Sequence, residues 1–154
     1  MDHSKYEKVE SLRPFFDLIE EAIGDLVDGD HFFDYFAKDG VLEAKYAMSG
    51  VFRTEGRDKI LASFQRYGDI LWLDSMSDLK VHYGRDPNEV ILEYTSHGKG
   101  VKTGNPYNNC YASFIRLENR KIKYWLDYID QVEVMRATGT TDRIKERGAL
   151  QSSQ

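Results

Sequence analysis

The chain of 154 residues has one cysteine, Cys110, so an intrachain disulfide is excluded and the framework of small secreted proteins gains no support. It has no apolar run of membrane-spanning length, and its formal net charge of -5 comes without a long Lys/Arg cluster. An acidic chain of this kind is a poor ligand for nucleic acids and anionic membranes. We therefore expect a cytoplasmic protein with neither a nucleic-acid partner nor a membrane partner.

Signatures of bound cofactors are also scarce. The sequence shows neither a phosphate-cradling glycine loop nor a dinucleotide-binding fingerprint, and its four histidines lack metal-ligand spacing. We expect no cofactor and no metal site. Aromatic residues, in contrast, make up 13% of the chain, with ten Tyr and eight Phe, which is compatible with a pocket lined by rings.

The first part of the chain predicts helices. Apolar residues recur at three- and four-residue spacings over 11–28, and Pro14 fits the first turn of that helix. A short second helix is expected over 31–37, with Asp30 as its cap, and a third opens near Gly56 and ends near 68.

Strands dominate the rest of the chain. Alternating segments separated by turn residues are expected at 41–48, 51–55, 79–83, 89–100, 107–117 and 121–129. Helices followed by turn-linked strands predict an α+β protein, with three helices on a curved antiparallel sheet that leaves a cavity on its concave side. Gly98 and Gly100 inside a strand indicate a bend in that sheet. We expect one domain over 1–136 and a flexible polar tail over 137–154.

Asp127 is the leading candidate for chemistry. It lies in an aromatic strand, and alternation places Trp125, Asp127 and Ile129 on one face. A carboxylate among apolar side chains has a raised pKa, which suits a proton carrier. A structural acid bonded to a neighbouring strand is the competing interpretation.

His97 is the second candidate, because an imidazole near a carboxylate can shuttle protons. It shares a strand face with Glu93 and Thr95, and it could equally be an exposed strand histidine. Other polar or aromatic side chains could line a substrate pocket, or could simply pack in the core. The residues assigned to substrate binding are Tyr46, Tyr94, Asn109, Tyr111 and Trp125, and Tyr107 could also present its hydroxyl.

The order of elements and several short motifs identify a family resemblance. These motifs are FAKDGVLE at 36–43, EGRDKI at 55–60, DPN at 86–88, YNN at 107–109, NRKI at 119–122 and YWLDYID at 124–130. Over about residues 12 to 136 the chain resembles the nuclear transport factor 2-like superfamily, in its SnoaL-like branch of polyketide-cyclase-type proteins. The stretch 86–100 also resembles the phenazine-biosynthesis A/B proteins.

The resemblance implies a cone of helices and curved sheet, often assembled as a homodimer that packs sheet to sheet. In the phenazine proteins an acid on the last strand does acid/base work, and that position falls on Asp127. The general base of ketosteroid isomerase falls on Ala44, which carries no proton acceptor, and the phenazine proteins' pocket histidine has no match near 62–64.

We therefore expect a cofactor-independent enzyme, such as a cyclase, isomerase or dehydratase-type lyase, acting on a hydrophobic, polycyclic or secondary-metabolite-like substrate. Asp127 and His97 would be its catalytic residues, with Asp127 as the acid/base and a tyrosine as the alternative to His97 as its partner. A small-molecule-binding or interaction protein without chemistry is the first alternative. An epoxide hydrolase is the second, and it requires Arg53 or Arg116 to approach Asp127.

Overall fold

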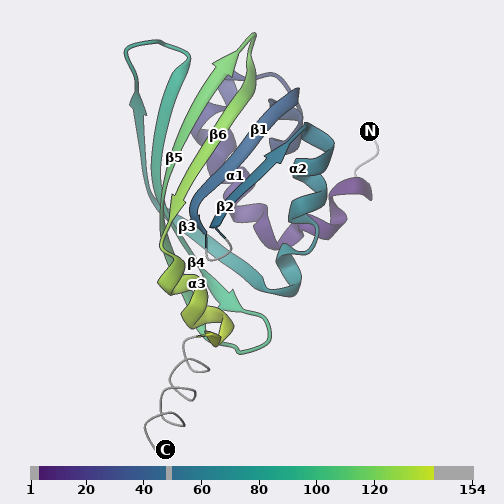
Figure 1. The fold of residues 1–154 in the computed structure, drawn as a ribbon, viewed down its shortest axis with the longest axis vertical. Coiled ribbons are helices and arrows are strands. Elements are labelled where there is room, and N and C mark those ends of the chain that lie inside the picture. Colours follow the sequence, from purple (N-terminus) through teal and green to yellow (C-terminus); the bar gives the residue numbers. More distant parts are fainter. Residues whose placement is uncertain (1–3, 48–49, 141–154) are drawn as a thin grey trace, which may run out of the picture.

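The computed structural model describes residues 4–47 and 50–140, without the side chains of residues 46, 47, 50 and 51. Its strands form one curled six-stranded sheet in the order β2-β1-β6-β5-β4-β3 (Figure 1). The strands are β1 (Phe36–Ala47), β2 (Gly50–Glu55), β3 (Leu71–Tyr83), β4 (Glu89–Gly100), β5 (Pro106–Glu118) and β6 (Lys121–Ile129). The pair β1–β6 is parallel and the other pairs are antiparallel. The predicted α+β fold is confirmed, while the sheet is mixed rather than purely antiparallel.

Three α-helices accompany the sheet: α1 (Arg13–Ile23), α2 (Arg57–Phe64) and α3 (Gln131–Thr138). Helices α1 and α2 lie on one side of the sheet, and α3 lies at one end of it (Figure 1). The described residues also contain four 3-10 segments: η1 (Ser4–Leu12), η2 (Gly24–Leu26), η3 (Phe32–Tyr35) and η4 (Tyr67–Asp69).

Two of the predicted helices are confirmed in shortened form, and the third α-helix lies elsewhere. Pro14 occupies the first turn of α1 as expected, because its missing N–H needs no partner there. The segment predicted as a helix over 31–37 is the 3-10 turn η3, and the side chain of His31, rather than Asp30, caps it. Asp130 caps α3 by accepting a hydrogen bond from the backbone N–H of Val132 at 2.9 Å.

Tight turns and bulges give the sheet its curl. Asn119 and Arg120 both have positive φ in the two-residue β5–β6 turn, which matches the twist of an antiparallel hairpin. Register shifts interrupt the β3–β4 pairing twice, and one of them contains Asp78 at φ 58°. Each bulge adds local twist, so the sheet curves around the helices.

Gly98 is needed where the bulged part of β3 approaches β4. A Cβ atom at this position would lie 2.0 Å from the carbonyl oxygen of Trp72. Gly100 is similarly crowded, because a Cβ there would lie 2.0 Å from the carbonyl oxygen of Ala137 in α3. The expected irregularity is confirmed at Gly98, which pairs with Leu73 next to a register shift. Gly100 lies in a regular part of the pairing, and its missing side chain leaves room for the backbone of α3.

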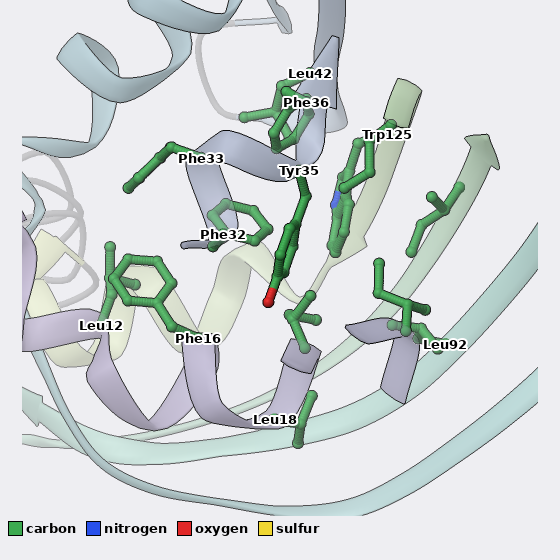
Figure 2. Packing of buried hydrophobic residues seen from close by; sticks show 14 of the residues in the cluster. Leu12, Phe16, Leu18, Phe32, Phe33, Tyr35, Phe36, Leu42, Leu92 and Trp125 are labelled. Atoms are coloured by element: carbon green, nitrogen blue, oxygen red, sulfur yellow. The ribbon is translucent and has the colours of Figure 1, made fainter. Parts of the chain in front are cut away.

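The core fills the space between the concave face of the sheet and the helices. Phe32 and Trp125 meet edge to face with ring centroids 5.5 Å apart, and Phe36 packs beside them (Figure 2). On β4 the even-numbered residues, such as Leu92, are buried and face this core. The tail expected from 137 includes the end of α3, while residues 141–154 lie outside the described residues.

Candidate active site

A cavity of about 260 Å³ opens between the helices and the concave face of the sheet. This volume is slightly below the range of about 300 to 1,000 Å³ that is typical of small-molecule sites. Side chains from every strand of the sheet, together with η1, α1, α2, η4 and α3, line it. They are Leu12, Phe15, Leu42, Ala44, Phe52, Phe64, Tyr67, Leu71, Leu73, Met76, Tyr94, Tyr107, Tyr111, Asp127, Ile129, Gln131 and Val134. The lining is almost entirely apolar or aromatic, so the apolar surface of a bound molecule would be removed from contact with water.

Asp127 carries the one carboxyl group among the described residues that line the cavity. Its Oδ1 atom accepts hydrogen bonds from the hydroxyl of Ser113 at 2.5 Å and from the indole N–H of Trp125 at 2.6 Å. Burial raises the pKa of Asp127 to about 6, and the two hydrogen bonds oppose that rise by stabilising the anion. A carboxyl with this pKa exchanges its proton near neutral pH, as a general acid or base must.

The two oxygens of Asp127 have different surroundings. Both hydrogen bonds from the described residues reach Oδ1 and none reaches Oδ2. Among the described residues, the hydroxyl of Ser11 is the only fully buried side-chain polar atom without a hydrogen-bond partner. Oδ2 has no partner among them either, so it is not fully buried. Oδ2 is therefore the oxygen that a molecule in the cavity can reach.

A chain of hydroxyl groups supports Asp127 from behind. The single proton of Ser113 is directed to Asp127, so the hydroxyl of Tyr94, 2.7 Å from the Ser113 Oγ, donates to Ser113. Ser113 is fully buried and pairs with Asp127 across β5 and β6. This chain fixes the orientation of the carboxyl group.

A second polar group lies in the same cavity, around three tyrosines. The hydroxyls of Tyr107 and Tyr111 are 2.7 Å apart, and the Ser96 hydroxyl lies 3.1 Å from that of Tyr111. The hydroxyl of Tyr67 lies beside both phenols, and burial raises its pKa well above the usual value for tyrosine. Burial has the same effect on Tyr107 and Tyr111, so all three stay protonated hydrogen-bond donors.

The structure does not bring His97 to Asp127. His97 lies on the outer, convex face of the sheet, where its Nε2 is 2.7 Å from the Ser77 hydroxyl and its Nδ1 is 2.8 Å from the Asn108 carboxamide oxygen. The predicted pairing of His97 with Asp127 is wrong, because β4 presents Tyr94 to the cavity, buries Ser96 on the same face and places His97 on the opposite face.

The predicted substrate-binding residues divide into three groups. Tyr94 and Tyr111 line the cavity as expected. Trp125 and Asn109 are fully buried behind its wall, where Asn109 bonds to Tyr107 and to the backbone of Asp130. The backbone of Tyr46 belongs to β1, but its side chain lies outside the described residues.

Sequence reasoning missed Ser113 and Tyr67. Ser113 could be found only from the cross-strand register, which places it opposite Asp127. Tyr67 lies in η4, after the predicted third helix, where no periodic pattern indicates which side chains face inward. Ala44, which occupies the position that corresponds to the general base of ketosteroid isomerase, also lines the cavity. It pairs with Asp127 across the parallel strands β1 and β6.

The cavity carries no cationic side chain among its described lining residues. Arg116 bonds to Glu89 at 2.6 Å, and Arg53 bonds to Glu43 at 3.2 Å, both outside the cavity. Neither arginine can join Asp127 in activating a water, so the geometry opposes the epoxide hydrolase reading.

Comparison with known proteins identifies the family. A model of the SnoaL-like domain matches residues 13–125, and the chain therefore belongs to this family within the nuclear transport factor 2-like superfamily. The uncharacterized protein YesE of Bacillus subtilis is 29% identical over 138 residues, covering 88% of this chain and 90% of its own length. An uncharacterized PhzA/B-like protein of Pseudomonas aeruginosa is 31% identical over 109 residues, covering 69% of this chain and 75% of its own length.

Solved structures agree on the fold. The structure of a candidate isomerase from Bacillus subtilis has a TM-score of 0.68 and 28% identity, covering 90% of this chain and 96% of that one. Candidate polyketide cyclases share the fold with TM-scores of 0.62 and 0.63 at 16% and 17% identity, which shows the fold alone. Within the described part of the chain, no helix has the length and apolar character that crossing a membrane requires.

Proposed function

We propose that this chain is a cofactor-independent enzyme that transfers protons on a small apolar substrate held in the cavity, in the manner of an isomerase, cyclase or dehydratase. One observation carries the proposal: the carboxyl of Asp127 lies in an apolar cavity, with Oδ1 held by two donors and Oδ2 left accessible. The names of the relatives, isomerase and polyketide cyclase, are consistent with this class of reaction.

The chemistry follows from the state of the carboxyl. Ionised Asp127 takes a proton from a carbon next to a carbonyl group, so the C–H bond breaks and its electron pair moves to the carbonyl oxygen as an enolate. Asp127, now protonated, returns the proton to another atom of the substrate. Ser113 and Trp125 hold the carboxyl in place during both steps and stabilise its anionic form.

Tautomerisation of benzoylacetone, a small neutral aromatic diketone with an acidic C–H bond, tests the proposal. The protein should accelerate its enol-to-keto conversion and its exchange with deuterium, and the rate should rise with pH through about 6 as Asp127 ionises. Asp127→Asn should lower this rate at least about 100-fold. Asp17→Asn, at an exposed position of α1, is the matched control and should leave the rate unchanged.

A non-catalytic binding protein predicts a different result. In that case benzoylacetone binds to both the parent protein and Asp127→Asn, and neither accelerates its tautomerisation. Equal acceleration by the parent protein and Asp127→Asn would place the chemistry on another group and remove Asp127 from the mechanism.

We also propose a homodimer that forms through the outer face of the sheet. Phe114 on β5 is 40% exposed on this face and meets Tyr128 of β6 edge to face at 5.7 Å. Ile91 of β4 and Leu126 of β6 pair with Phe114 across the sheet, which extends the apolar surface around these rings. Helices α1 and α2 cover the opposite side (Figure 1). Two copies related by a two-fold axis would each cover the other's apolar face.

A further inference from the structure

The cavity has two polar ends separated by a pair of stacked tyrosines. The rings of Tyr94 and Tyr111 lie 5.0 Å apart and within 13° of parallel. Their hydroxyls bond in opposite directions, that of Tyr94 to Ser113 and that of Tyr111 to Ser96. The first direction leads to Asp127, and the second leads to the tyrosine cluster, defined as Tyr67, Tyr107 and Tyr111.

The strand register gives the distance between these ends. Ser113 pairs with Asp127, and Ser96 pairs with Asn109, which lies four residues before Ser113 on β5. Four residues of an antiparallel strand span about 14 Å between Cα atoms. These two strand positions bracket the stacked tyrosines, so the two polar ends are on the order of 10 Å apart.

The tyrosine cluster has protons to offer to a ligand. The hydroxyls of Tyr67, Ser96, Tyr107 and Tyr111 carry four protons, while the two hydrogen bonds of normal length among them use two. The side-chain amide of Asn109 donates a hydrogen bond to the Tyr107 oxygen at 2.9 Å, so this bond uses none of the four hydroxyl protons. Tyr67 also interacts with both phenols. An oxygen atom that enters the cluster can accept a hydrogen bond while the Tyr107–Tyr111 and Ser96–Tyr111 bonds stay in place.

We propose that the tyrosine cluster is an oxygen-binding subsite, and that the substrate is an uncharged, flat molecule with an acceptor oxygen on the order of 10 Å from the carbon that Asp127 deprotonates. Carbonyl, ether and hydroxyl oxygens satisfy this requirement. Carboxylates do not, because the described lining contains no cation to balance their charge and burial of an unpaired anion is unfavourable.

This inference rests on the proposed function for the position of the reacting carbon, but its test does not depend on turnover. The probes are three naphthalenes of similar size: acetylnaphthalene with an acceptor oxygen, ethylnaphthalene without one, and naphthoate with a negative charge. Their dissociation constants are measured by calorimetry near pH 8, where Asp127 is ionised and cannot donate a hydrogen bond.

Acetylnaphthalene should bind about 3- to 10-fold more tightly than ethylnaphthalene, as one net hydrogen bond predicts, and naphthoate should bind most weakly. Tyr111→Phe and Tyr107→Phe should each reduce or remove the preference for acetylnaphthalene and leave ethylnaphthalene binding within about two-fold. Tyr83→Phe, at a residue 63% exposed near the end of β3, should keep the preference, and so should Asp127→Asn. Melting curves establish that each variant is folded.

Several results would overturn the subsite. They are equal binding of the two uncharged probes, failure of both to bind, tight binding of naphthoate, or a preference that survives in both tyrosine variants. A preference that grows in Asp127→Asn and is unaffected by both tyrosine variants would place the oxygen beside residue 127 instead, because at this pH the asparagine amide can donate a hydrogen bond and the carboxylate cannot. Both proposals would be supported if Asp127→Asn loses benzoylacetone turnover and keeps the tyrosine-dependent preference for acetylnaphthalene. If the parent protein shows the preference but no turnover, the oxygen-binding subsite would be supported and the proposed enzymatic function would be refuted.

Discussion

Asp127→Asn should stabilise the folded protein at neutral and basic pH. The carboxyl has a pKa of about 6 in the folded state, compared with 3.8 in the unfolded chain. Between these values Asp127 binds more protons in the folded state than in the unfolded state, so its contribution to the stability of the parent protein falls as pH rises from about 4 to about 6. The asparagine side chain cannot ionise, and its carbonyl oxygen can still accept from Ser113 and Trp125.

The expected gain follows from the difference between the two pKa values, at about 1.4 kcal/mol for each factor of ten in proton affinity. Above pH 6 the ionisation penalty amounts to about 3 kcal/mol, and weaker hydrogen bonds to a neutral amide offset part of it. Asp127→Asn should therefore be more stable than the parent protein by about 1 to 3 kcal/mol near pH 8. Near pH 4, where the parent carboxyl is protonated in the folded state, the difference should become small.

Urea denaturation of both proteins at about pH 4, 6 and 8 measures this difference. An Asp127→Asn variant less stable than the parent protein near pH 8 by more than about 1 kcal/mol would contradict this expectation, because the ionised carboxyl would then be a net stabilising group. A stability difference that does not change with pH would also contradict it. Asp17→Asn serves as the control, since this exposed position should show neither effect.

The remaining predictions concern a second titrating group, a close contact and the outer face. Burial among aromatic rings lowers the pKa of His31 from 6.5 to about 4, so the contribution of His31 to stability should fall as pH falls from about 6.5 to 4, by less than about 3 kcal/mol because the ring is partly exposed, which is opposite in sign to the contribution of Asp127. The stability of His31→Phe relative to the parent protein should therefore rise as pH falls through this range, as urea denaturation measures. Gly98→Ala should lower stability by about 3 kcal/mol or more in thermal melts, because its Cβ would collide with the Trp72 carbonyl, and an unchanged melting temperature would contradict that packing. Phe114→Glu should convert the dimer to a monomer in light scattering, and a parent protein that is already monomeric at high concentration would refute the dimer.

Local patterns in the sequence predicted several parts of this molecule correctly. The α1 helix and its Pro14 follow from helical periodicity, and the β5–β6 turn follows from the polar residues around Asn119. The surroundings of Asp127 were also predictable, because its apolar neighbours along the strand are read directly from the sequence. Each of these features depends on residues close together in the chain.

The face on which Asp127 lies depended on an irregularity that the sequence pattern did not reveal. Next to the turn, Leu117 pairs with Ile122, and a regular hairpin continued from that pair would set Asp127 opposite Ala112. One extra residue on β6, Lys123, shifts the register, so Asp127 pairs with Ser113 instead. A one-residue shift moves every later side chain of the strand to the other face.

That shift explains why the pairing of Asp127 with His97 was wrong. Ala112 pairs with Glu93, whose side chain lies on the same outer face as His97, whereas Ser113 pairs with Leu92 and faces the cavity. The sequence by itself determined that an acid would lie in an apolar strand of an α+β protein. The tertiary structure, through one bulge between β5 and β6, decided that this acid meets Ser113, Tyr94 and the cavity, because strand register depends on hydrogen bonds between segments rather than on the order of residues within one.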